Sequence, residues 1–233
     1  MDFDLTPYFT KYEALLAAAE EVFGRVRRAH EDCVKCKTKC ADCCYALFDL
    51  TLIEALYLNQ RFYQKFKGRQ REALLEKTNR ADRKIHKIKR KAYSDLEAGK
   101  PEARILAEMA LERVRCPLLN EEDLCDLYEC RPITCRFYGI PTSIGGAGHT
   151  CGKSGFEKGK KYPTVKLDAI HGQLQKISAE LVRDLKSRYV KLADMLVPLS
   201  MALLTEYDEA YLGIDDGGDP RDDPRRAAQE EKR

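Results

Sequence analysis

The 233-residue chain has no tryptophan, four methionines and only four histidines, and it lacks a long apolar run. Its longest apolar stretch, residues 193–204, contains Asp194 and Pro198 and is shorter than the roughly 20 residues that a transmembrane helix needs. We therefore expect no membrane-spanning segment. The histidines are too scattered along the chain to suggest a shared site, and they are His30, His86, His149 and His171.

Signatures of several enzyme classes are also missing. The sequence shows no Ser/His/Asp order and no paired-carboxylate motif, and the glycine-rich residues 145–148 lack the Gly-Lys-Ser/Thr ending of a phosphate loop. The first five residues are acidic and show neither the basic start nor the apolar run of a secretory signal. We expect a reducing, cytoplasmic setting, in which disulfides are the weaker explanation for clustered cysteines. No catalytic residue can be named, and whether the chain is an enzyme stays open.

Cysteine, by contrast, is abundant. The ten cysteines fall into two clusters, one at residues 33–44 and the other at residues 116–151. Chelation needs several soft thiolates within about 4 Å of one another, and spacings of two or three residues achieve this at little cost in loop closure. The clusters therefore predict a metal site. Their members are Cys33, Cys36, Cys40, Cys43 and Cys44 in the first, and Cys116, Cys125, Cys130, Cys135 and Cys151 in the second.

The spacing within the first cluster limits how it can bind metal. On one helix the steps from Cys33 to Cys43 would put the thiols on one face, but ten helical residues extend roughly 15 Å. Sulfurs that share one zinc lie only about 4 Å apart. The segment must therefore loop around the metal, or its thiols must divide between two sites. Adjacent side chains diverge, so Cys43 and Cys44 favour a multi-iron cluster or two metals, unless one is buried as an ordinary apolar residue.

The rest of the chain has helical periodicity. Apolar residues recur at steps of three and four over residues 7–30 and from Leu167 to Leu196, and Thr51 with Glu54 forms a capping-box pattern that starts a helix running to about residue 67. A basic helix and a helix at 101–115 should follow. Residues 116–163 lose the periodicity and should form loops with short helical turns, and we see no convincing strand pattern.

We predict a mainly α fold, in which a helical domain is organised around a cysteine-rich metal site in irregular loops. The single domain would span residues 1–212, with its cysteine core at about 33–152. The long C-terminal helix, at about 164–197, should pack on the protein's own helices, with a coiled-coil partner as the alternative. Residues 213–233 should form a disordered, charged tail.

A basic stripe covers residues 65–91, where twelve lysines and arginines face three acidic residues. It is compatible with a nucleic-acid-binding surface, although the net charge of the whole chain is only +3. A solvated helix is the favoured interpretation, because aromatic residues are nearly absent among the basic ones.

Two linked motifs resemble the YkgJ-type cysteine-cluster family, a proposed zinc- or iron-chelating domain. The first is Cys36-x3-Cys40-x2-Cys43-Cys44 followed by Leu50-Thr51-x2-Glu54, and the second is Cys116-Pro-x-Leu, Cys125-x2-Tyr128-x2-Arg131-Pro132-x2-Cys135-Arg136 and a closing Cys151. The resemblance covers about residues 33–152 and leaves Cys33 and Cys130 as extras. It implies eight metal ligands, namely Cys36, Cys40, Cys43, Cys44, Cys116, Cys125, Cys135 and Cys151.

The cysteine motif is also similar to that of flagellin lysine methylases, which are associated with an iron–sulfur cluster and S-adenosylmethionine. This resemblance favours an iron–sulfur cluster slightly over Zn²⁺, but no methyl-donor pocket signature accompanies it. Arg131 and Arg136 are expected to face the thiolates and offset their charge. His149, two residues before Cys151, is a further candidate ligand.

Three functions are compatible with these patterns. The first is a cysteine-ligated metal-binding protein, with iron–sulfur or zinc, in a structural, redox or electron-transfer role. The second is a metal- or cluster-dependent protein-modifying enzyme, lysine methylase-like. The third is a zinc-organised protein that associates with nucleic acid. We do not favour nucleic acid as a partner. A protein partner remains open in each case.

Overall fold

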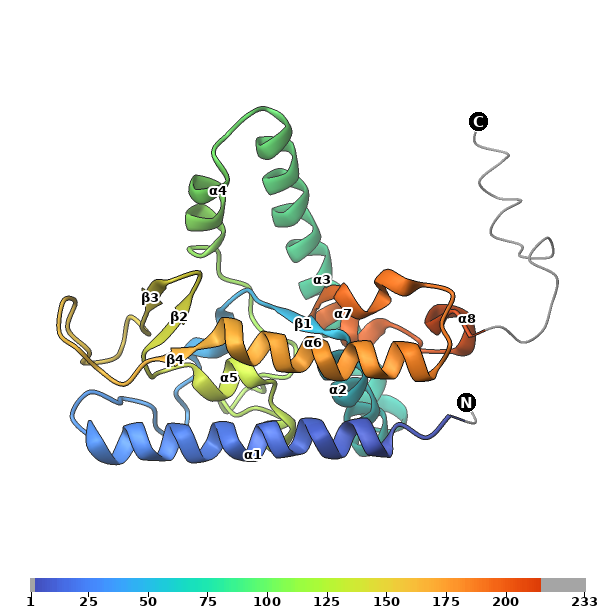
Figure 1. Cartoon of the computed structure of the whole chain (residues 1–233), viewed down its shortest axis with the longest axis horizontal. Helices are drawn as coiled ribbons and strands as arrows, with labels where there is room; N and C mark the ends of the chain where they lie inside the picture. Colours follow the sequence, from blue (N-terminus) through green and yellow to red (C-terminus); the bar gives the residue numbers. More distant parts are fainter. Residues whose placement is uncertain (1–2, 215–233) are drawn as a thin grey trace.

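The computed structural model of the protein describes residues 3–214, and over this range the chain is mainly α-helical, as predicted (Figure 1). Three 3-10 helices, at Asp42–Tyr45, Tyr128–Cys130 and Val190–Asp194, accompany the longer elements. The α-helices are α1 (Thr6–Ala29), α2 (Leu52–Lys65), α3 (Gly68–Glu97), α4 (Glu102–Met109), α5 (Ile133–Phe137), α6 (Leu167–Asp184), α7 (Leu199–Leu204) and α8 (Glu209–Leu212), and the strands are β1 (Asp49–Thr51), β2 (Thr142–Ile144), β3 (Ala147–His149), β4 (Val165–Lys166) and β5 (Leu196–Pro198).

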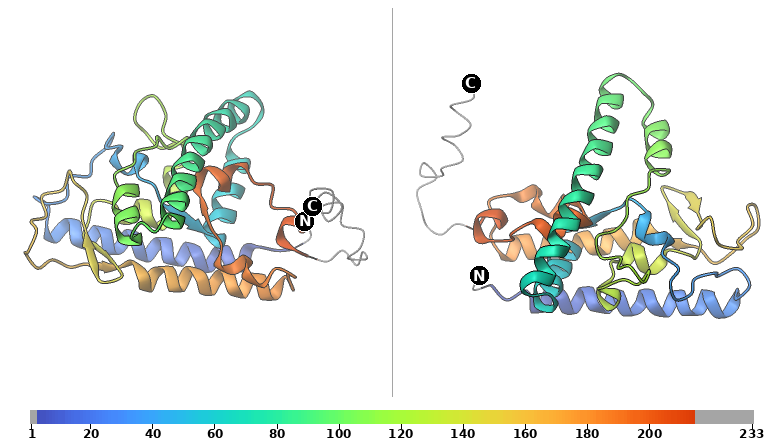
Figure 2. Two further views of the ribbon diagram at one scale, coloured as in Figure 1. Left: turned by 90° about the horizontal axis from the view of Figure 1, so that it is seen from above. Right: turned by 180° about the vertical axis from the view of Figure 1, so that it is seen from behind.

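Two long helices, α1 and α6, lie side by side and run antiparallel along the molecule (Figures 1 and 2). The apolar stripe of α1, which includes Tyr12 and Leu16, is buried, as its periodicity predicts. Polar contacts fix the alignment of the pair: Tyr8 Oη donates to Asp184 Oδ2 at 2.6 Å, and Lys11 forms an ion pair with Glu180. Helix α1 of this pair packs against α5, which carries Cys135.

The centre of the molecule is α2, whose residues from Leu52 to Leu58 are all buried. The predicted capping box is confirmed, since Glu54 Oε2 accepts from the Thr51 main-chain N–H at 3.1 Å and from the Thr51 hydroxyl at 2.9 Å. The Ser178 hydroxyl of α6 accepts from the main-chain N–H of Ile53, in the first turn of α2, at 3.2 Å. The start of α2 is therefore held by its own residues and by α6.

The strands differ from the sequence prediction, which had none. An antiparallel pair joins β1 to β5, with Asp49 opposite Pro198, and a three-stranded sheet has the order β3-β2-β4. Each strand has only two or three residues, which is too short for an alternating apolar pattern to stand out.

The C-terminal helix is also shorter than expected, because α6 ends at Asp184 and does not reach residue 197. Lys186 adopts a left-handed conformation, with φ of 53°, and Ser187 N–H donates to Val182 O at 3.1 Å. The chain then turns back through a 3-10 helix into β5. The apolar repeat beyond residue 184 is still partly buried, for example at Leu192 and Val197, but from other backbone conformations.

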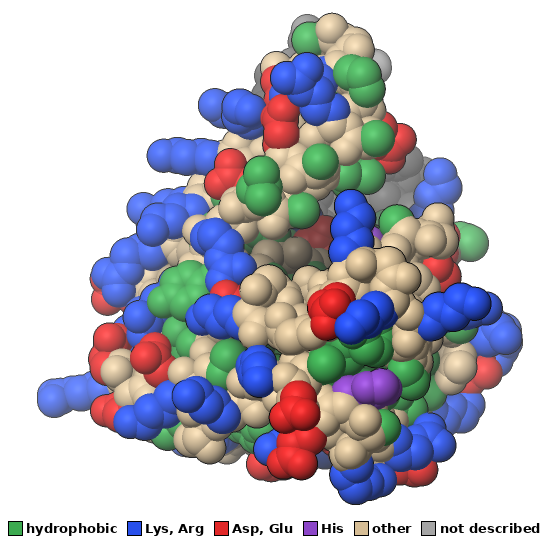
Figure 3. Space-filling model, turned by 90° about the vertical axis from the view of Figure 1, so that its left-hand side faces the viewer, with side chains coloured by type: hydrophobic (Ala, Val, Ile, Leu, Met, Phe, Trp, Pro, Cys, Tyr) green, Lys and Arg blue, Asp and Glu red, His purple; other side chains and the backbone are tan. Residues whose placement is uncertain are grey.

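The far half of α3 rises out of the body, and α4 packs against its end (Figures 1 and 2). Only Leu74, Thr78 and Ala81 of α3 are buried. On the face shown in Figure 3, the Lys and Arg side chains are interspersed with acidic ones. The basic stripe is therefore mostly a solvated helix surface.

The sequence predicts no membrane-spanning segment and a disordered tail at residues 213–233. In the described part of the chain, no helix is both long enough and apolar enough to cross a bilayer. The expected tail at 213–233 lies outside the described residues from residue 215 onward.

Glu54 supplies the test of this part of the fold. The two carboxylate oxygens of Glu54 accept hydrogen bonds from Thr51 and Ile133, and replacing Glu54 with Gln leaves only one acceptor oxygen. We expect the free energy of unfolding to fall by about 1–3 kcal/mol, the usual effect of leaving a buried donor unsatisfied. Urea unfolding measures this change in free energy, and the substitution Glu76→Gln at an exposed position is the control. Equal, small changes in both variants would contradict this role.

Candidate metal centre

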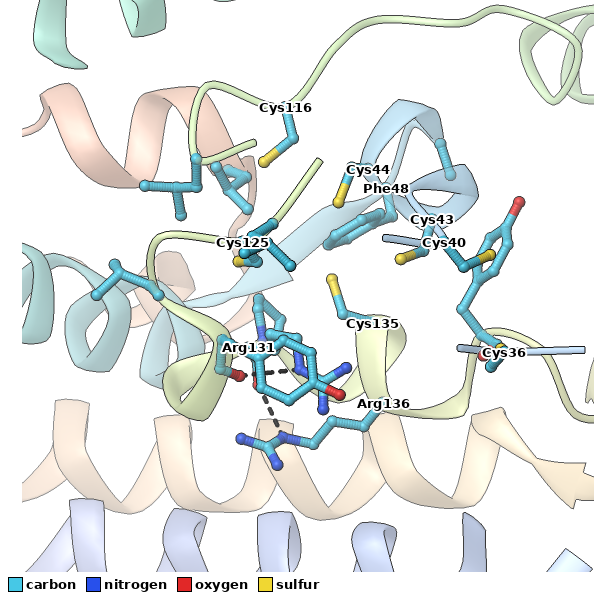
Figure 4. Close-up of a pocket in the computed structure, with 18 of the residues that line it drawn as sticks. Cys36, Cys40, Cys43, Cys44, Phe48, Cys116, Cys125, Arg131, Cys135 and Arg136 are labelled. Atoms are coloured by element: carbon cyan, nitrogen blue, oxygen red, sulfur yellow. Dashed lines mark hydrogen bonds between the residues drawn. The ribbon is translucent and has the colours of Figure 1, made fainter. Parts of the chain in front are cut away.

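A cavity of about 810 Å³ lies between α1 and the two cysteine-bearing segments. Figure 4 shows several sulfurs directed into one space beside the ring of Phe48. The structure thus brings together most of the predicted site residues from both clusters. The cysteines that line the cavity are Cys36, Cys40, Cys43, Cys44, Cys116, Cys125 and Cys135.

Main-chain hydrogen bonds join the two clusters. Cys116 N–H donates to Cys44 O at 2.7 Å, and Val114 N–H donates to Tyr45 O at 3.1 Å. This short ladder places Cys44 and Cys116 side by side, although 71 residues lie between them in the sequence.

Cys125 returns to the same place through a tight turn. The turn is closed by a β-bridge between Leu119 and Cys125 and by the Asn120 side chain, which accepts from the Leu124 N–H at 2.9 Å. Lys65, at the end of α2, donates to Asp126 O at 2.6 Å and ties the turn to the helical body. The thiol of Cys125 is thereby held opposite that of Cys116.

Cys135 comes from α5, a one-turn helix that begins directly after Pro132. The first main-chain donor of α5, Ile133 N–H, is bound by Glu54 Oε1 at 3.2 Å. Glu54 is 4% exposed, and burial raises the pKa of its carboxyl above the ordinary value. The Leu-Thr-x2-Glu motif therefore has a structural task, because one buried side chain fixes both the start of α2 and the helix that carries Cys135.

Tyr138 links two of the remaining predicted cysteines, Cys36 and Cys151. Cys36 Sγ is 3.6 Å from Tyr138 O, and Cys151 Sγ is 3.6 Å from Asp42 Oδ2. Tyr138 Oη donates to that same carboxylate oxygen at 3.1 Å. Cys151 does not line the cavity itself, but these contacts place it at the end where Cys36 and Cys40 lie.

The loop after Cys151 is pinned to the end of α1. Gly155 N–H donates to Cys33 O at 2.8 Å, and the rings of Phe156 and Tyr162 pack edge to face with centroids 4.9 Å apart. His30 packs on Tyr162 at 5.4 Å. These contacts hold Cys151 near the first cluster.

Three other candidate residues, all within the described range, are not brought into the cavity. Cys33 lies behind it against Gly155, and Cys130 is near the charges of Arg61 and Lys65. His149 is exposed in β3, paired with Thr142 of β2. The structure thus keeps the two extra cysteines apart from the other eight.

Comparison with known families supports the same part of the chain. Residues 35–152 match the family model CxxCxxCC, described as "Putative zinc- or iron-chelating domain". The chain belongs to this family. A search of curated proteins finds no match, and neither does a search of solved structures. The matched residues of the chelating domain include every cysteine that faces the cavity.

The thiols of the chelating domain differ in acidity. Burial raises the pKa of Cys36 to about 11, with a contribution from the neighbouring Cys40, and burial raises that of Cys116 to about 12. A hydrogen bond from Cys44 lowers the pKa of Cys43 to about 7. A metal that binds here must therefore displace protons from most of the thiols.

Main-chain donors point at three of the sulfurs. Cys151 Sγ accepts from the Lys153 N–H at 3.4 Å, and N–H groups two residues downstream reach the sulfurs of Cys116 and Cys125 in the same way. Such bonds favour the thiolate over the thiol, as a metal ligand requires.

Asp42 was missed by sequence reasoning. Partial burial acts to raise the pKa of the Asp42 carboxyl, but hydrogen bonds from Tyr138 and Arg113 lower it below its ordinary value. The sequence does contain a signal for Asp42, namely its position beside Cys43, because an acidic residue inside a cluster of thiols needs a cationic partner. Arg113 is that partner, with Nη2 2.8 Å from Asp42 Oδ1.

Arg131 and Arg136 line the cavity, and both donate hydrogen bonds to loop carbonyls and to Glu20. Arg136 is 7% exposed and donates to Glu20 of α1 and to the carbonyls of Glu129 and Arg131. Arg131 stacks on the Tyr128 ring at 3.6 Å and donates to Glu20 at 3.1 Å. Their positive charge still lies beside the thiols, while their donors fasten the second cluster to α1.

The donor set consists mainly of cysteine thiols, which are the ligands that zinc and iron–sulfur clusters both take. Within residues 3–214, no three His, Cys, Asp or Glu side chains form a ready ligand set for a single ion. Cysteines that hold an iron–sulfur cluster are spaced more widely than those sharing one ion, because each binds a different iron. Seven thiols line the one cavity here.

The two arginines should differ in their effect on stability. Arg136→Met leaves two carbonyls and Glu20 without a buried donor, so we expect about 1–3 kcal/mol less stability and reduced metal content. Arg131→Met removes the stacking on the exposed Tyr128 ring, one main-chain hydrogen bond and one of the two arginine contacts to Glu20, with an expected loss of about 1 kcal/mol or less. Urea unfolding and metal analysis measure both. A larger loss of stability in Arg131→Met than in Arg136→Met would show that Arg136 is not the main link between the second cysteine cluster and α1.

Proposed function

We propose that this protein binds an iron–sulfur centre through cysteine and serves a redox or electron-transfer role, with structural Zn²⁺ as the alternative. The observation that carries the proposal is the gathering of seven cysteines from two distant segments around one cavity, with Cys151 next to it. Family membership supports metal chelation but does not distinguish iron from zinc.

The number of thiols supports iron–sulfur over a single zinc. A structural zinc site takes four ligands, whereas seven cysteines line this cavity. The cavity of about 810 Å³ is far larger than a single ion needs. The proposed ligands are Cys36, Cys40, Cys43, Cys44, Cys116, Cys125, Cys135 and Cys151.

The surrounding residues suit a negatively charged centre. When bound, an iron–sulfur cluster supplies one-electron transfer, and its potential depends on nearby charge, hydrogen bonds to sulfur and solvent exposure. Here the main-chain N–H groups after Cys116, Cys125 and Cys151 donate to sulfur. Arg131 supplies positive charge that lowers the thiol pKa of Cys125 against the effect of burial.

We also propose that residues up to 212 act as one domain. The cysteine segments are fixed to α1 through Glu20, to α2 through Glu54, and to each other through Cys44 and Cys116. A centre at their junction would stabilise all of these contacts together.

Nucleic acid binding has little support in the contacts of α3. Lys89 pairs with Asp49 at 2.6 Å, and Lys77 pairs with Glu121 at 3.2 Å. Arg80 and Lys91 each pair with an acidic residue four positions away on the same helix. These ion pairs neutralise part of the stripe that would otherwise face phosphates.

The experiment that tests the proposal is metal and acid-labile sulfide analysis, with visible and EPR spectra, on the full chain purified without oxygen. We expect iron and sulfide together, a brown colour and an EPR signal after reduction. A colourless protein with stoichiometric zinc would select the alternative. A chain that takes up neither metal, even on reconstitution, would overturn the proposal.

Metal removal should also destabilise the fold. Several thiolates held together repel one another and are poorly solvated once their counter-ion is gone. We expect chelation under reducing conditions to lower the melting temperature. The check is a thermal melt paired with metal analysis, and an unchanged melt with demonstrated metal loss would count against a stabilising centre.

A further inference from the structure

The eight cysteines outnumber the ligands that one centre needs. A cubane cluster takes four cysteines, and a structural zinc also takes four. Their arrangement in the structure is not uniform: in Figure 4 the sulfurs of Cys44, Cys116, Cys125 and Cys135 surround one part of the cavity, while Cys36 and Cys40 lie farther along it.

The first group, here the inner set, consists of Cys44, Cys116, Cys125 and Cys135. Three of its members are tied together through the main chain, by the Cys116–Cys44 hydrogen bond of 2.7 Å and by the Leu119–Cys125 bridge that closes the turn after Cys116. Cys135 faces them from α5, which Glu54 fixes to the body. The inner set is therefore anchored to the buried core.

The second group, here the outer set, consists of Cys36, Cys40, Cys43 and Cys151. Its anchors are different, because Cys36 contacts Tyr138 O, and Cys151 contacts Asp42, to which Tyr138 also donates. The loop after Cys151 is held to the segment that follows α1, where Gly155 N–H donates to Cys33 O, and Lys153 forms an ion pair with Asp42 at 3.8 Å. Cys43 lies between the two sets, because its thiol is hydrogen-bonded to that of Cys44 in the inner set, while its immediate neighbour Asp42 belongs to the outer contacts.

We propose that the cysteines form two metal centres, an inner one on Cys44, Cys116, Cys125 and Cys135 and an outer one on Cys36, Cys40, Cys43 and Cys151. The inference rests on the proposed metal-binding function. It explains why eight cysteines are gathered here, although one cubane cluster or one structural zinc takes only four.

Gly139 offers a way to disturb one set alone. Its φ is 105°, a conformation that side chains rarely adopt, and a Cβ built there would lie 2.3 Å from Cys36 Sγ. The substitution Gly139→Ala must therefore displace the sulfur of Cys36. Gly172→Ala on α6 is the matched control, because a Cβ at that position meets nothing within 4 Å.

The test uses the full chain, purified or reconstituted without oxygen, as wild type, Gly139→Ala, Cys36→Ser/Cys40→Ser, Cys125→Ser/Cys135→Ser and Gly172→Ala. Iron, zinc and sulfide per chain are measured, with EPR spectra after dithionite reduction. The two outer variants should retain about half of the wild-type metal, that of one four-cysteine centre. Their EPR spectrum should match that of one isolated centre, without the broadening that two neighbouring spins give. The Gly172→Ala variant should resemble wild type.

Several results would overturn the two-centre arrangement. One is wild-type protein that holds metal for a single centre only; another is full metal content and an unchanged spectrum in both outer variants. Complete loss of metal from a folded Gly139→Ala protein would also contradict it, because the inner set should survive. If the Cys125→Ser/Cys135→Ser variant does not fold, the outer variants decide the question. Wild-type protein without any metal would instead overturn the proposed function itself.

Discussion

Two main-chain hydrogen bonds, from Cys116 N–H to Cys44 O and from Val114 N–H to Tyr45 O, are the constraint on which the rest of the structure depends. They bring together two segments whose thiols would otherwise lie far apart. Loop closure over so many residues costs entropy, so other contacts must hold the junction. The helices around it can be understood as the framework that supplies those contacts.

Buried charged side chains make most of the connections between this framework and the cysteines. Glu54 joins the start of α2 to α5, and Arg136 joins α1 to the carbonyls around Cys130 through Glu20. Each is almost fully enclosed, and each is satisfied by hydrogen bonds. Their side chains contact the protein framework, while the thiols are left to face the cavity. This division of tasks separates the residues that hold the site from those that would bind metal.

The sequence predicted the parts of this fold that local chemistry determines. Helix α1 and the Thr51–Glu54 cap follow from periodicity and a four-residue pattern, and both are confirmed. The end of α6 depends on the left-handed Lys186 and on packing beyond it, which an apolar repeat does not reveal. The cysteine motifs indicated which thiols are candidate metal ligands. They did not indicate that Arg136 pairs with Glu20, a distant residue on α1. Contacts between remote residues depend on the tertiary fold, so spacing alone could not predict them.

The most direct test of the central claim is X-ray absorption at the iron and zinc edges of the full chain, purified without oxygen. If the cavity thiols bind the metal, the first shell should contain sulfur only, at about 2.3 Å, with a second iron visible beyond it when the metal is an iron–sulfur cluster. A first shell dominated by nitrogen or oxygen would contradict the account, because it would place the metal away from the cysteines.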